Sequence, residues 1–378
     1  MLLNKRPYKT WVEISRKALL HNLSVFRKIV GDKIIMAVVK AEAYGHGLVE
    51  VASVLKEKID WFAVDNYEEG LRLRAQGIKK PILVLGYTPL DRLKESIEAN
   101  LSLTVYDERT IKKLISLKSS KAKLHLKIET GLNRQGLGSK EASKLARLIL
   151  KHSEILEIEG LSTHFANIED TTSPQFAQKQ LGEFRKTIKI LEENGVKPAV
   201  THCAASAATL LYPETHFDLV RVGISIYGLW PSEKTQQAVN GKMDLSLKPV
   251  LSWKSMVAQV KWVDKGDSIG YDRTWFAPKK SKVAVIPVGY SDGYDRGFSN
   301  KARVLINGKY EPVVGRVAMN MIVVDVTKAG HVKSESEVVL IGKQKELEVN
   351  TEELAQHSGT INYEIVSRIN PNLPRIIV

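Results

Sequence analysis

The chain has 378 residues, and its 56 basic and 42 acidic residues give a net charge of +14. Hydrophobic residues make up 43% and charged residues 26%, an ordinary globular composition with enough apolar material for a core. The single cysteine, Cys203, excludes an internal disulfide framework and is typical of a reducing compartment.

The N-terminal residues, MLLNKRPYKTW, contain no apolar stretch long enough for a signal peptide. No run approaches the roughly 18 apolar residues that a membrane-spanning helix needs. We therefore expect a cytoplasmic protein that does not contact a membrane. The lysines are scattered, as in KLISLKSSKAKLHLK, without interleaved aromatic residues, which favours a soluble basic surface over a nucleic-acid-binding face.

Short apolar runs alternate with longer amphipathic segments over the first two-thirds of the sequence. Short continuous apolar runs are typical of strands that are buried on both faces of a sheet. One intervening segment, TTSPQFAQKQLGEFRKTIKILEENG, carries Thr, Ser and Pro at its start and Gly195 at its end, which marks a helix. The runs that we interpret as strands are Ile34–Val39, Trp61–Val64, Ile82–Leu85, Leu103–Val105, His125–Ile128, Gly160–Thr163, Ala199–His202 and Leu219–Arg221.

Eight strand–helix units in about 200 residues predict an α/β fold, a (β/α)8 TIM-type barrel. An open, doubly wound sheet is the structural alternative. Such a sheet usually contains fewer strands, and no GxGxxG motif follows the first run.

The pattern changes near Trp230. After Leu245 the sequence alternates strands and turns, and the Asn307-Gly308 pair between two apolar runs indicates a hairpin. The C-terminal third is therefore predicted to be mostly β. We expect a barrel over residues 1–240 and a mostly-β domain over residues 241–378, with residues 10–15 pairing with the second domain.

Polar side chains follow several of the predicted strands. In a barrel of this type the functional groups lie where strands end and the following loops begin. A convergent set of lysine, tyrosine, arginine, histidine and serine at one rim points to chemistry more strongly than any one of them. The residues at this rim are Lys40, Tyr44, Lys127, Glu129, Arg134, His164, His202, Ser206, Arg221, Gly223 and Ile224.

The loops after the last two predicted barrel strands, HCAASAAT and RVGISIYG, suggest a phosphate site. Ser206 offers a hydroxyl at the start of a helix, and the N–H groups of Gly223 and Ile224 are expected to be free to donate. A phosphate cradle opposite an inward lysine suggests pyridoxal phosphate, bound covalently through Lys40. A free lysine has a pKa near ~10.4, so burial is expected to help this amine lose its proton.

The sequence resembles the bacterial alanine racemases, which are fold-type III pyridoxal-phosphate enzymes. The stretch VVKAEAYGHG looks like their cofactor-lysine motif. The resemblance continues over nearly the whole chain through KIETGLNRQG, THFANIEDTT, HCAASAAT, VRVGISIYG, IGYDRTW, IPVGYSDGYDRG, VVGRVAMNM and TINYEIVSRINPNLPRI.

The resemblance implies a two-base racemisation of L-alanine and D-alanine, which feeds D-alanine to peptidoglycan. Lys40 would carry the cofactor and act as one acid/base group, and Tyr271 from the other subunit of a homodimer would be the second. His164 with Arg221 behind it would make Tyr271 a better base. Arg221 would also contact the cofactor pyridine nitrogen and, because an arginine accepts no proton, would limit side transamination.

Further roles follow from the same resemblance. Cofactor phosphate would be bound by Tyr44, Ser206, Gly223, Ile224 and Tyr363. Substrate would be bound by Arg134, Met319 and Tyr290, with Met319 coming from the partner subunit, and Lys127 would be carbamylated so that it orients Arg134. No metal is expected. His202 and Cys203 are interpreted as packing residues.

The sequence departs from the family pattern near substrate and cofactor, which leaves the substrate range open. The departures are Glu42, Ala205, Asp272, Ala318 and Asn320. One alternative is a serine racemase or a racemase of broader specificity. A related decarboxylase would use an acidic group where Arg221 stands. A cofactor-binding protein without catalysis would lack the C-terminal domain that supplies Tyr271, Met319 and Tyr363.

Overall fold

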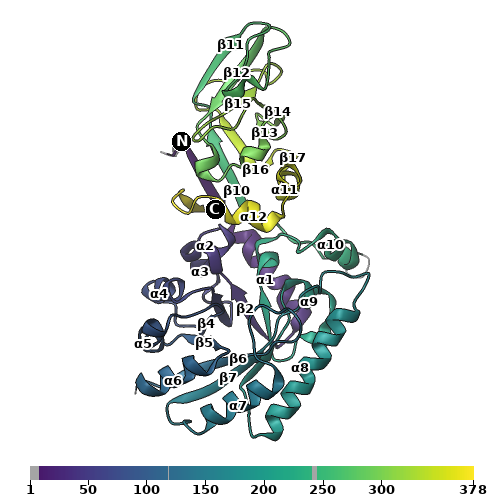
Figure 1. Ribbon diagram of the computed structural model, residues 1–378. Helices are drawn as coiled ribbons and strands as arrows, with labels where there is room; N and C mark the ends of the chain where they lie inside the picture. Colours follow the sequence, from purple (N-terminus) through teal and green to yellow (C-terminus); the bar gives the residue numbers. More distant parts are fainter. Residues whose placement is uncertain (1–7, 118, 241–244) are drawn as a thin grey trace. The chain divides into compact units, whose positions relative to one another are not determined.

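A computed structural model of the chain describes residues 8–117, 119–240 and 245–378. The chain divides into two compact units (Figure 1). The first, here called the β unit, comprises Met1–Lys17, Glu42–Glu50 and Pro249–Val378. The second, the barrel unit, comprises Ala18–Ala41 and Val51–Lys248. Two N-terminal segments thus belong with the C-terminal residues.

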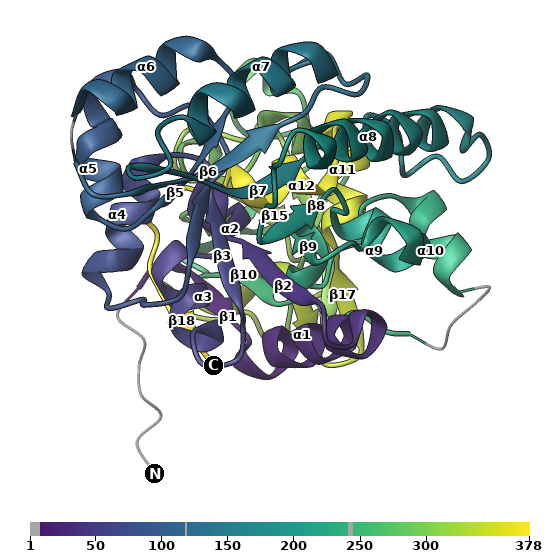
Figure 2. The ribbon, with the colours of Figure 1, turned by 90° about the horizontal axis from the view of Figure 1, so that it is seen from below.

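Within the described residues, the barrel unit contains eight parallel strands in the order β8-β7-β6-β5-β4-β3-β2-β9 (Figure 2). Main-chain hydrogen bonds join the two ends of this order, from Asp218 N to Thr201 O at 3.1 Å and from Arg221 N to Ala204 O at 2.9 Å. The sheet is therefore a nearly closed barrel, as expected, and not an open doubly wound sheet. The strands are β2 (Ile34–Val38), β3 (Trp61–Val64), β4 (Ile82–Val84), β5 (Ser102–Val105), β6 (Ala122–Lys127), β7 (Leu156–Ser162), β8 (Val200–His202) and β9 (Leu219–Val222).

Helices cover the outside of the barrel (Figure 2). Helix α8 (Gln175–Glu193) lies where the sequence predicts a helix, and it buries Leu181, Phe184 and Leu191 on one face. Gly195, at φ +81°, follows its C-terminal cap. No helix within residues 8–117, 119–240 and 245–378 has the length and apolarity needed to cross a membrane. The other helices after the strands are α3 (Leu48–Leu55), α4 (Tyr67–Ala75), α5 (Leu93–Glu98), α6 (Glu108–Leu117), α7 (Ser139–Leu150), α9 (Ser206–Leu211) and α10 (Glu233–Asn240), with α1 (Arg16–Val30) before β2 and short turns η1 (Leu90–Arg92), η2 (Pro213–Thr215) and η3 (Ile224–Tyr227).

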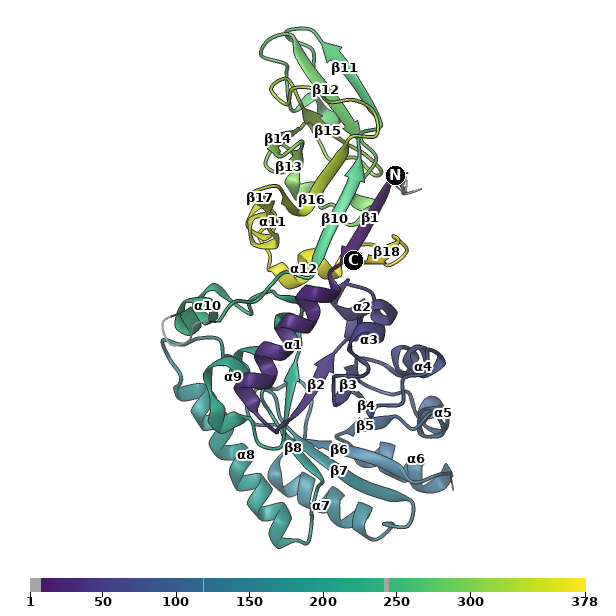
Figure 3. The same ribbon diagram turned by 180° about the vertical axis from the view of Figure 1, so that it is seen from behind.

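The β unit is built on one mixed sheet in the order β11-β12-β15-β14-β13-β16-β10-β1-β18, with β17 on β16. Figure 3 shows β1 beside β10 and β18: β1 pairs antiparallel with β10 and parallel with β18. Its strands are β1 (Thr10–Ile14), β10 (Leu251–Met256), β11 (Gln259–Val263), β12 (Ser281–Ile286), β13 (Arg303–Ile306), β14 (Lys309–Val314), β15 (Ile322–Asp325), β16 (Glu337–Gln344), β17 (Leu347–Val349) and β18 (Arg375–Ile377).

A tight hairpin joins β13 and β14 at Asn307 and Gly308, both with positive φ, which confirms the turn that the sequence predicts.

Trp253, Tyr294 and Phe298 stack edge to face in the core of the unit. Short helical elements connect or flank the strands: η4 (Tyr271–Arg273), η5 (Tyr290–Asp292), η6 (Arg296–Phe298), α11 (Thr351–Ser358) and α12 (Asn362–Ser367).

Candidate functional site

Lys40 follows the buried strand β2 after one residue, Val39. Its ammonium nitrogen Nζ lies 3.4 Å from Oδ1 of Asp65, which stands at the end of the neighbouring strand β3. The Lys40 side chain is 39% exposed. The expectation of a buried lysine is therefore wrong, because the strand is buried while the amine that follows it is accessible and paired.

The segment after Lys40 is a left-handed turn, α2 (Lys40–Tyr44). Ala41, Glu42, Ala43 and Tyr44 have φ values between +52° and +54°. Residues with a β-carbon adopt this conformation singly and at a cost of about 1–2 kcal/mol each, so four in succession require strong support from their surroundings.

Tertiary contacts supply that support. Glu69 accepts hydrogen bonds from Ala41 N at 2.6 Å and from Asp65 N at 2.8 Å. The guanidinium of Arg375 donates from Nε and Nη2 to Gly45 O at 3.0 and 2.8 Å. A β-carbon at Gly45 would overlap the main-chain oxygen of Val366, so the chain passes too close there for any other residue.

Glu42, a departure from the family pattern, has a local partner. Its Oε2 accepts from Leu48 N at 3.4 Å, at the start of α3, where helix N–H groups favour a negative charge. Tyr44, at the end of the same turn, lies against Tyr363 of α12, with ring centroids 6.1 Å apart. The left-handed turn therefore places Tyr44 beside the second tyrosine that the sequence links to the cofactor phosphate.

Arg221 is the centre of the polar interior of the barrel. Its Nη1 donates to Nδ1 of His202 at 2.7 Å, and its Nη2 donates to the main-chain oxygens of Thr163 and Cys203, both at 3.0 Å. Nη2 also lies 3.2 Å from Nδ1 of His164. Within residues 8–117, 119–240 and 245–378, no carboxylate pairs with this guanidinium.

The charge of Arg221 influences the pKa values of the neighbouring ionisable groups. Burial lowers the pKa of Arg221 to about 10, so it stays protonated at neutral pH. Burial, and then the Arg221 charge, hold the pKa values of His164 and Lys127 well below their ordinary values. Arg221 therefore places a cation beside a neutral imidazole at His164 and near a lysine, Lys127, that releases its proton readily.

Arg134 stands on the loop after β6 and is exposed. The Glu129 carboxylate shapes this loop by accepting from Gly131 N at 2.5 Å and from Arg134 N at 3.3 Å. These main-chain hydrogen bonds outweigh burial and lower the pKa of Glu129. Arg134 is close enough to Lys127 for its charge to lower the pKa of that amine.

Ser206 opens α9 and joins the loops after β8 and β9. Its Oγ accepts from Gly223 N at 3.0 Å and from Ser225 N at 3.4 Å. The expectation that Gly223 N–H is free for a phosphate is therefore wrong, because the serine hydroxyl already takes it. Ile224 is buried beside these groups. Neither α9 nor η3 begins with a side-chain cap.

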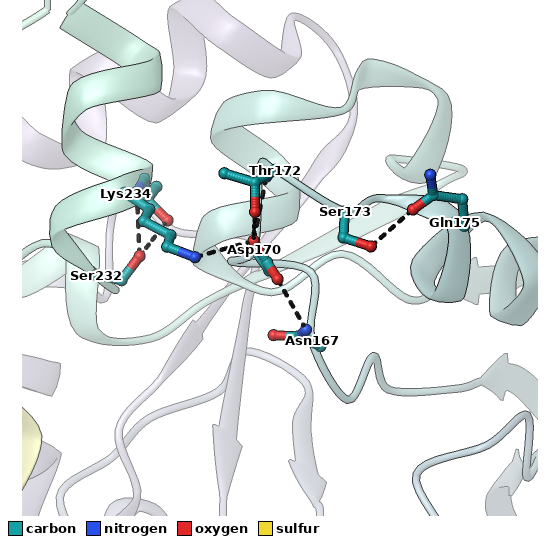
Figure 4. Close-up of polar contacts among 8 residues, drawn as sticks. Asn167, Asp170, Thr172, Ser173, Gln175, Ser232 and Lys234 are labelled. Carbon is teal, nitrogen blue, oxygen red and sulfur yellow. Dashed lines mark hydrogen bonds and ion pairs between the residues drawn. The ribbon is translucent and has the colours of Figure 1, made fainter.

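A polar cluster braces the loop that carries His164. In Figure 4, Asp170 Oδ1 lies 3.1 Å from Lys234 Nζ of α10 and accepts from Thr172 Oγ1 at 2.6 Å. The hydrogen bonds from Thr172 and Lys234 lower the pKa of Asp170. Gln180 of α8 holds the other end of the loop by accepting from Ala166 N at 2.9 Å.

Tyr271 projects from η4 in the β unit and is 70% exposed. The next residue, Asp272, has φ +59° and is a departure from the family pattern. Its Oδ2 lies 3.2 Å from Arg316 and 3.6 Å from Arg296, so two guanidinium groups hold the turn that presents Tyr271.

Tyr290 and Met319 lie on adjoining loops of the β unit. Tyr290 N donates to Ala318 O at 3.1 Å, and Ser291 N donates to Met319 O at 3.0 Å. A β-carbon at Gly289 would overlap Ala318 O, so this contact needs glycine. Asn320, another departure, donates to Ser291 Oγ at 2.7 Å and adds to the same contact.

Family models identify the chain. The model for the alanine racemase N-terminal domain matches residues 14–231, and the model for the alanine racemase C-terminal domain matches residues 250–377. The chain belongs to the alanine racemase family. It is therefore classed as an amino-acid racemase.

Individual relatives span nearly the whole chain. The chain is 40% identical over 370 residues to alanine racemase of Clostridium perfringens (strain SM101 / Type A), which covers 97% of this chain and 94% of that protein. It is 37% identical over 379 residues to alanine racemase 2 of Caldanaerobacter subterraneus subsp. tengcongensis, with 98% and 95% coverage.

Solved structures give the same fold. The crystal structure of alanine racemase from Bacillus anthracis with bound L-Ala-P matches with a TM-score of 0.92 at 36% identity, covering 99% of this chain and 96% of that one. Histidine racemase from Leuconostoc mesenteroides subsp. sake matches with a TM-score of 0.90 at 30% identity and 100% coverage of both chains. Racemases with different named substrates therefore share this fold.

Sequence reasoning missed several contacts around the candidate site residues of this alanine racemase family member. His202, interpreted as packing, accepts a hydrogen bond from Arg221, whereas Cys203 is buried and burial raises its thiol pKa to about 12. Asp65 and His125 were not singled out at all. A signal for His125 was present, because it stands two residues before Lys127 in a strand, and residues so spaced point to the same face.

Proposed function

We propose that the chain is a pyridoxal-phosphate-dependent alanine racemase that interconverts L-alanine and D-alanine. The proposal rests on the surroundings of Arg221. This residue is buried among neutral groups, and it has no carboxylate partner in the described part of the chain. If Arg221 held the pyridine nitrogen of the cofactor, it could not accept or share a proton there. It would then limit charge delocalisation into the ring, favour return of the proton to the substrate Cα, and disfavour the decarboxylase alternative.

The residues present fit this cofactor. Lys40 offers an accessible amine at the end of a strand, and Ser206 offers a buried hydroxyl where α9 begins without a side-chain cap. Ser225 Oγ is buried and has no hydrogen-bond partner among the described residues, which fits a site that an additional polar group completes. We assign the phosphate to Tyr44, Ser206, Ile224 and Tyr363, and leave out Gly223 because its N–H is taken by Ser206 Oγ. When bound, pyridoxal phosphate would supply an electron sink for the charge that develops at Cα.

Two groups on opposite faces of the substrate Cα are needed for racemisation. We assign Lys40 to one face and Tyr271 of the partner subunit to the other, so that one removes the Cα proton while the other returns a proton. His164, kept neutral and oriented by Arg221, would lie behind Tyr271 of the partner subunit and pass on the positive influence of that guanidinium.

A second copy of this chain would bring that tyrosine. The β unit exposes several large apolar side chains, and a partner that covers them would remove this apolar surface from water. We propose that a homodimer covers them and that each active site contains residues of both chains. These exposed residues include Tyr271, Phe276, Tyr290, Met319, Met321 and Ile361.

The substrate carboxylate is assigned to Arg134 and to Met319 of the partner subunit, with Tyr290 lining the entry. Lys127 is a candidate for carbamylation, because only a neutral amine reacts with carbon dioxide, and burial, followed by the charges of Arg221 and Arg134, lowers its pKa and favours that form. A carbamate there would place a negative charge beside Arg134 and orient it.

A racemase with another substrate, or with broader specificity that includes serine, is the second candidate. The structural similarity to a histidine racemase favours testing it, because the shared fold leaves the side-chain pocket undetermined. Initial rates with alanine, serine and histidine, followed by chiral chromatography, decide between them. A rate with serine or histidine above that with alanine would replace the alanine assignment.

We further propose that the protein works in the cytoplasm and supplies D-alanine for peptidoglycan, with no nucleic-acid partner. The scattered lysines support the last point, and salt-sensitive retention on DNA would contradict it. D-Alanine auxotrophy after deletion of the gene would support the role in cell-wall synthesis.

Two variants test the mechanism. Lys40→Ala should lose both the cofactor absorbance and racemisation, and Tyr271→Phe should slow racemisation by roughly 10²–10⁴-fold, the usual contribution of a general acid or base. Tyr8→Phe, another exposed tyrosine of the β unit, is the matched control and should behave as wild type. Normal racemisation in both directions by Tyr271→Phe would refute the two-base assignment.

A further inference from the structure

A continuous chain of buried polar side chains crosses the inside of the barrel from β5 to β9. Ser102 donates to Glu159 Oε2, which lies 3.1 Å from His125 Nε2. His125 Nδ1 lies 2.9 Å from His202 Nε2, and His202 Nδ1 lies 2.7 Å from Arg221 Nη1. All five residues are buried, and they come from neighbouring strands, β5, β7, β6, β8 and β9 (Figure 2).

Local features of the sheet make room for His125. A β-carbon at Gly160 would overlap the imidazole ring, so the absence of a side chain on β7 creates the space. The register between β6 and β7 shifts between Leu124 and His125, and the ring packs edge-on against Trp61 at 5.7 Å between centroids. The strands are therefore adapted to hold an imidazole at this position.

The position of each proton in this hydrogen-bonded network depends on the groups at its two ends, and Arg221 is the donor end. A guanidinium only donates, so the 2.7 Å contact requires a bare Nδ1 on His202. Burial and the Arg221 charge lower the pKa of His202 well below its ordinary value, so its single proton is on Nε2 and points to His125. His125 Nδ1 must then accept, which places a proton on its Nε2, facing Glu159.

Glu159 stands at the other end of this hydrogen-bonded network, where it accepts hydrogen bonds, whereas Arg221 donates them. Although burial opposes ionisation, hydrogen bonds from His125 and Ser102 lower the pKa of this carboxyl. An ionised carboxylate only accepts, so it fixes the proton of His125 on Nε2. An acceptor-only group at one end and a donor-only group at the other permit a single direction for every hydrogen bond between them.

We propose that Glu159 and His125 are positioning residues that set the tautomer of His202 and thereby hold Arg221 in its catalytic orientation. Neither makes a hydrogen bond to a residue that we assign to the cofactor, and both act through His202. The effect on turnover rests on the proposed function, whereas the tautomer does not depend on it.

A purely structural role for the same network makes different predictions. Removal of Glu159 would then lower stability, as the loss of any buried hydrogen bond does, and would leave proton positions and turnover unchanged. The tautomer of His202 therefore separates the two roles.

The first measurement is long-range ¹H–¹⁵N NMR of the wild-type holoenzyme labelled with ¹⁵N-histidine, with His202→Gln and His125→Gln used only to assign signals. We expect both His202 and His125 as neutral rings protonated on Nε2. A proton on Nδ1 of His202 in the wild type would overturn the proposal without any need for a functional variant.

The second measurement compares variants. Glu159→Gln can donate or accept at His125 by turning its amide, so Arg221 alone then opposes the reversed direction of the hydrogen bonds. We expect a detectable population of His202 protonated on Nδ1 and a tenfold fall in kcat, about 1.4 kcal/mol, with a KM changed less than twofold. Glu159→Asp keeps an acceptor-only carboxylate and should recover the wild-type tautomer and most of kcat.

Thr187→Val is the matched control, because it removes one hydrogen bond of a buried side chain, to Glu183 O on α8, and Thr187 is not part of the hydrogen-bonded network between Ser102 and Arg221. It should lower stability and leave kcat unchanged. A wild-type tautomer and kcat in Glu159→Gln would overturn the proposal. Absence of alanine turnover in the wild type would instead refute the proposed function, while the wild-type spectrum would still decide the tautomer.

Discussion

The left-handed turn after Lys40 predicts that Ala41→Gly stabilises the protein. Ala41 is exposed and has φ +52°, and its main-chain N–H donates to Glu69, a bond that glycine retains. Relief of the left-handed conformation contributes about 1–2 kcal/mol. The greater freedom of glycine in the unfolded chain offsets about 0.4–1 kcal/mol of this. We therefore expect a net gain of about 0.5–1 kcal/mol.

The assay is equilibrium denaturation by urea at fixed protein and cofactor concentrations, because ligand binding and association both shift apparent stability. Ala75→Gly is the matched control: Ala75 is also exposed, but it lies in the right-handed helix α4. There the same substitution should cost about 0.5–1 kcal/mol. A loss of stability in Ala41→Gly equal to that in Ala75→Gly would refute the argument that the turn carries conformational strain.

Three further predictions follow from buried groups. Burial, and then Asp325, raise the pKa of Glu311 to about 7. Between pH 4.5 and pH 7 the native state therefore keeps a proton that the unfolded chain releases, so the free energy of unfolding should fall as pH rises from about 4.5 to about 7. Urea denaturation at several pH values measures this fall, and Glu311→Gln should abolish it. Cys203 should resist iodoacetamide at pH 8 in the native protein and react after unfolding, as mass spectrometry can measure, because burial raises its pKa to about 12. Gly289→Ala should displace the loop of Met319 and reduce alanine turnover in a coupled assay while the cofactor absorbance stays unchanged.

The barrel could be predicted because its strands are buried on both faces. Runs such as Trp61–Val64 are continuously apolar, and their spacing with intervening helices admits few topologies. The left-handed turn could not be predicted in this way. Local propensity disfavours four such residues in succession, and only distant partners such as Glu69 and Arg375 make the conformation favourable.

The candidate site was partly predictable for a geometric reason. The carboxyl ends of parallel strands meet at one rim, so a polar residue after each strand predicts convergence, as at His164 and Arg221. Which hydrogen bond each group makes depends on atoms a few ångströms away in other strands. For that reason the sequence did not indicate that Ser206 takes the Gly223 N–H or that His202 accepts from Arg221.

The pairing of β1 with β18 also sets an order of events during synthesis. Val12 is opposite Arg375, so β1 leaves the ribosome before about 360 residues of intervening chain have been made, a wait of roughly 20–70 s at ordinary translation rates. β1 has no partner strand until β10, about 240 residues later, has been made, and its other edge stays unpaired until β18 follows. Because β1 is synthesised early and its partner strands are synthesised late, it is a natural binding site for a chaperone that recognises extended apolar segments.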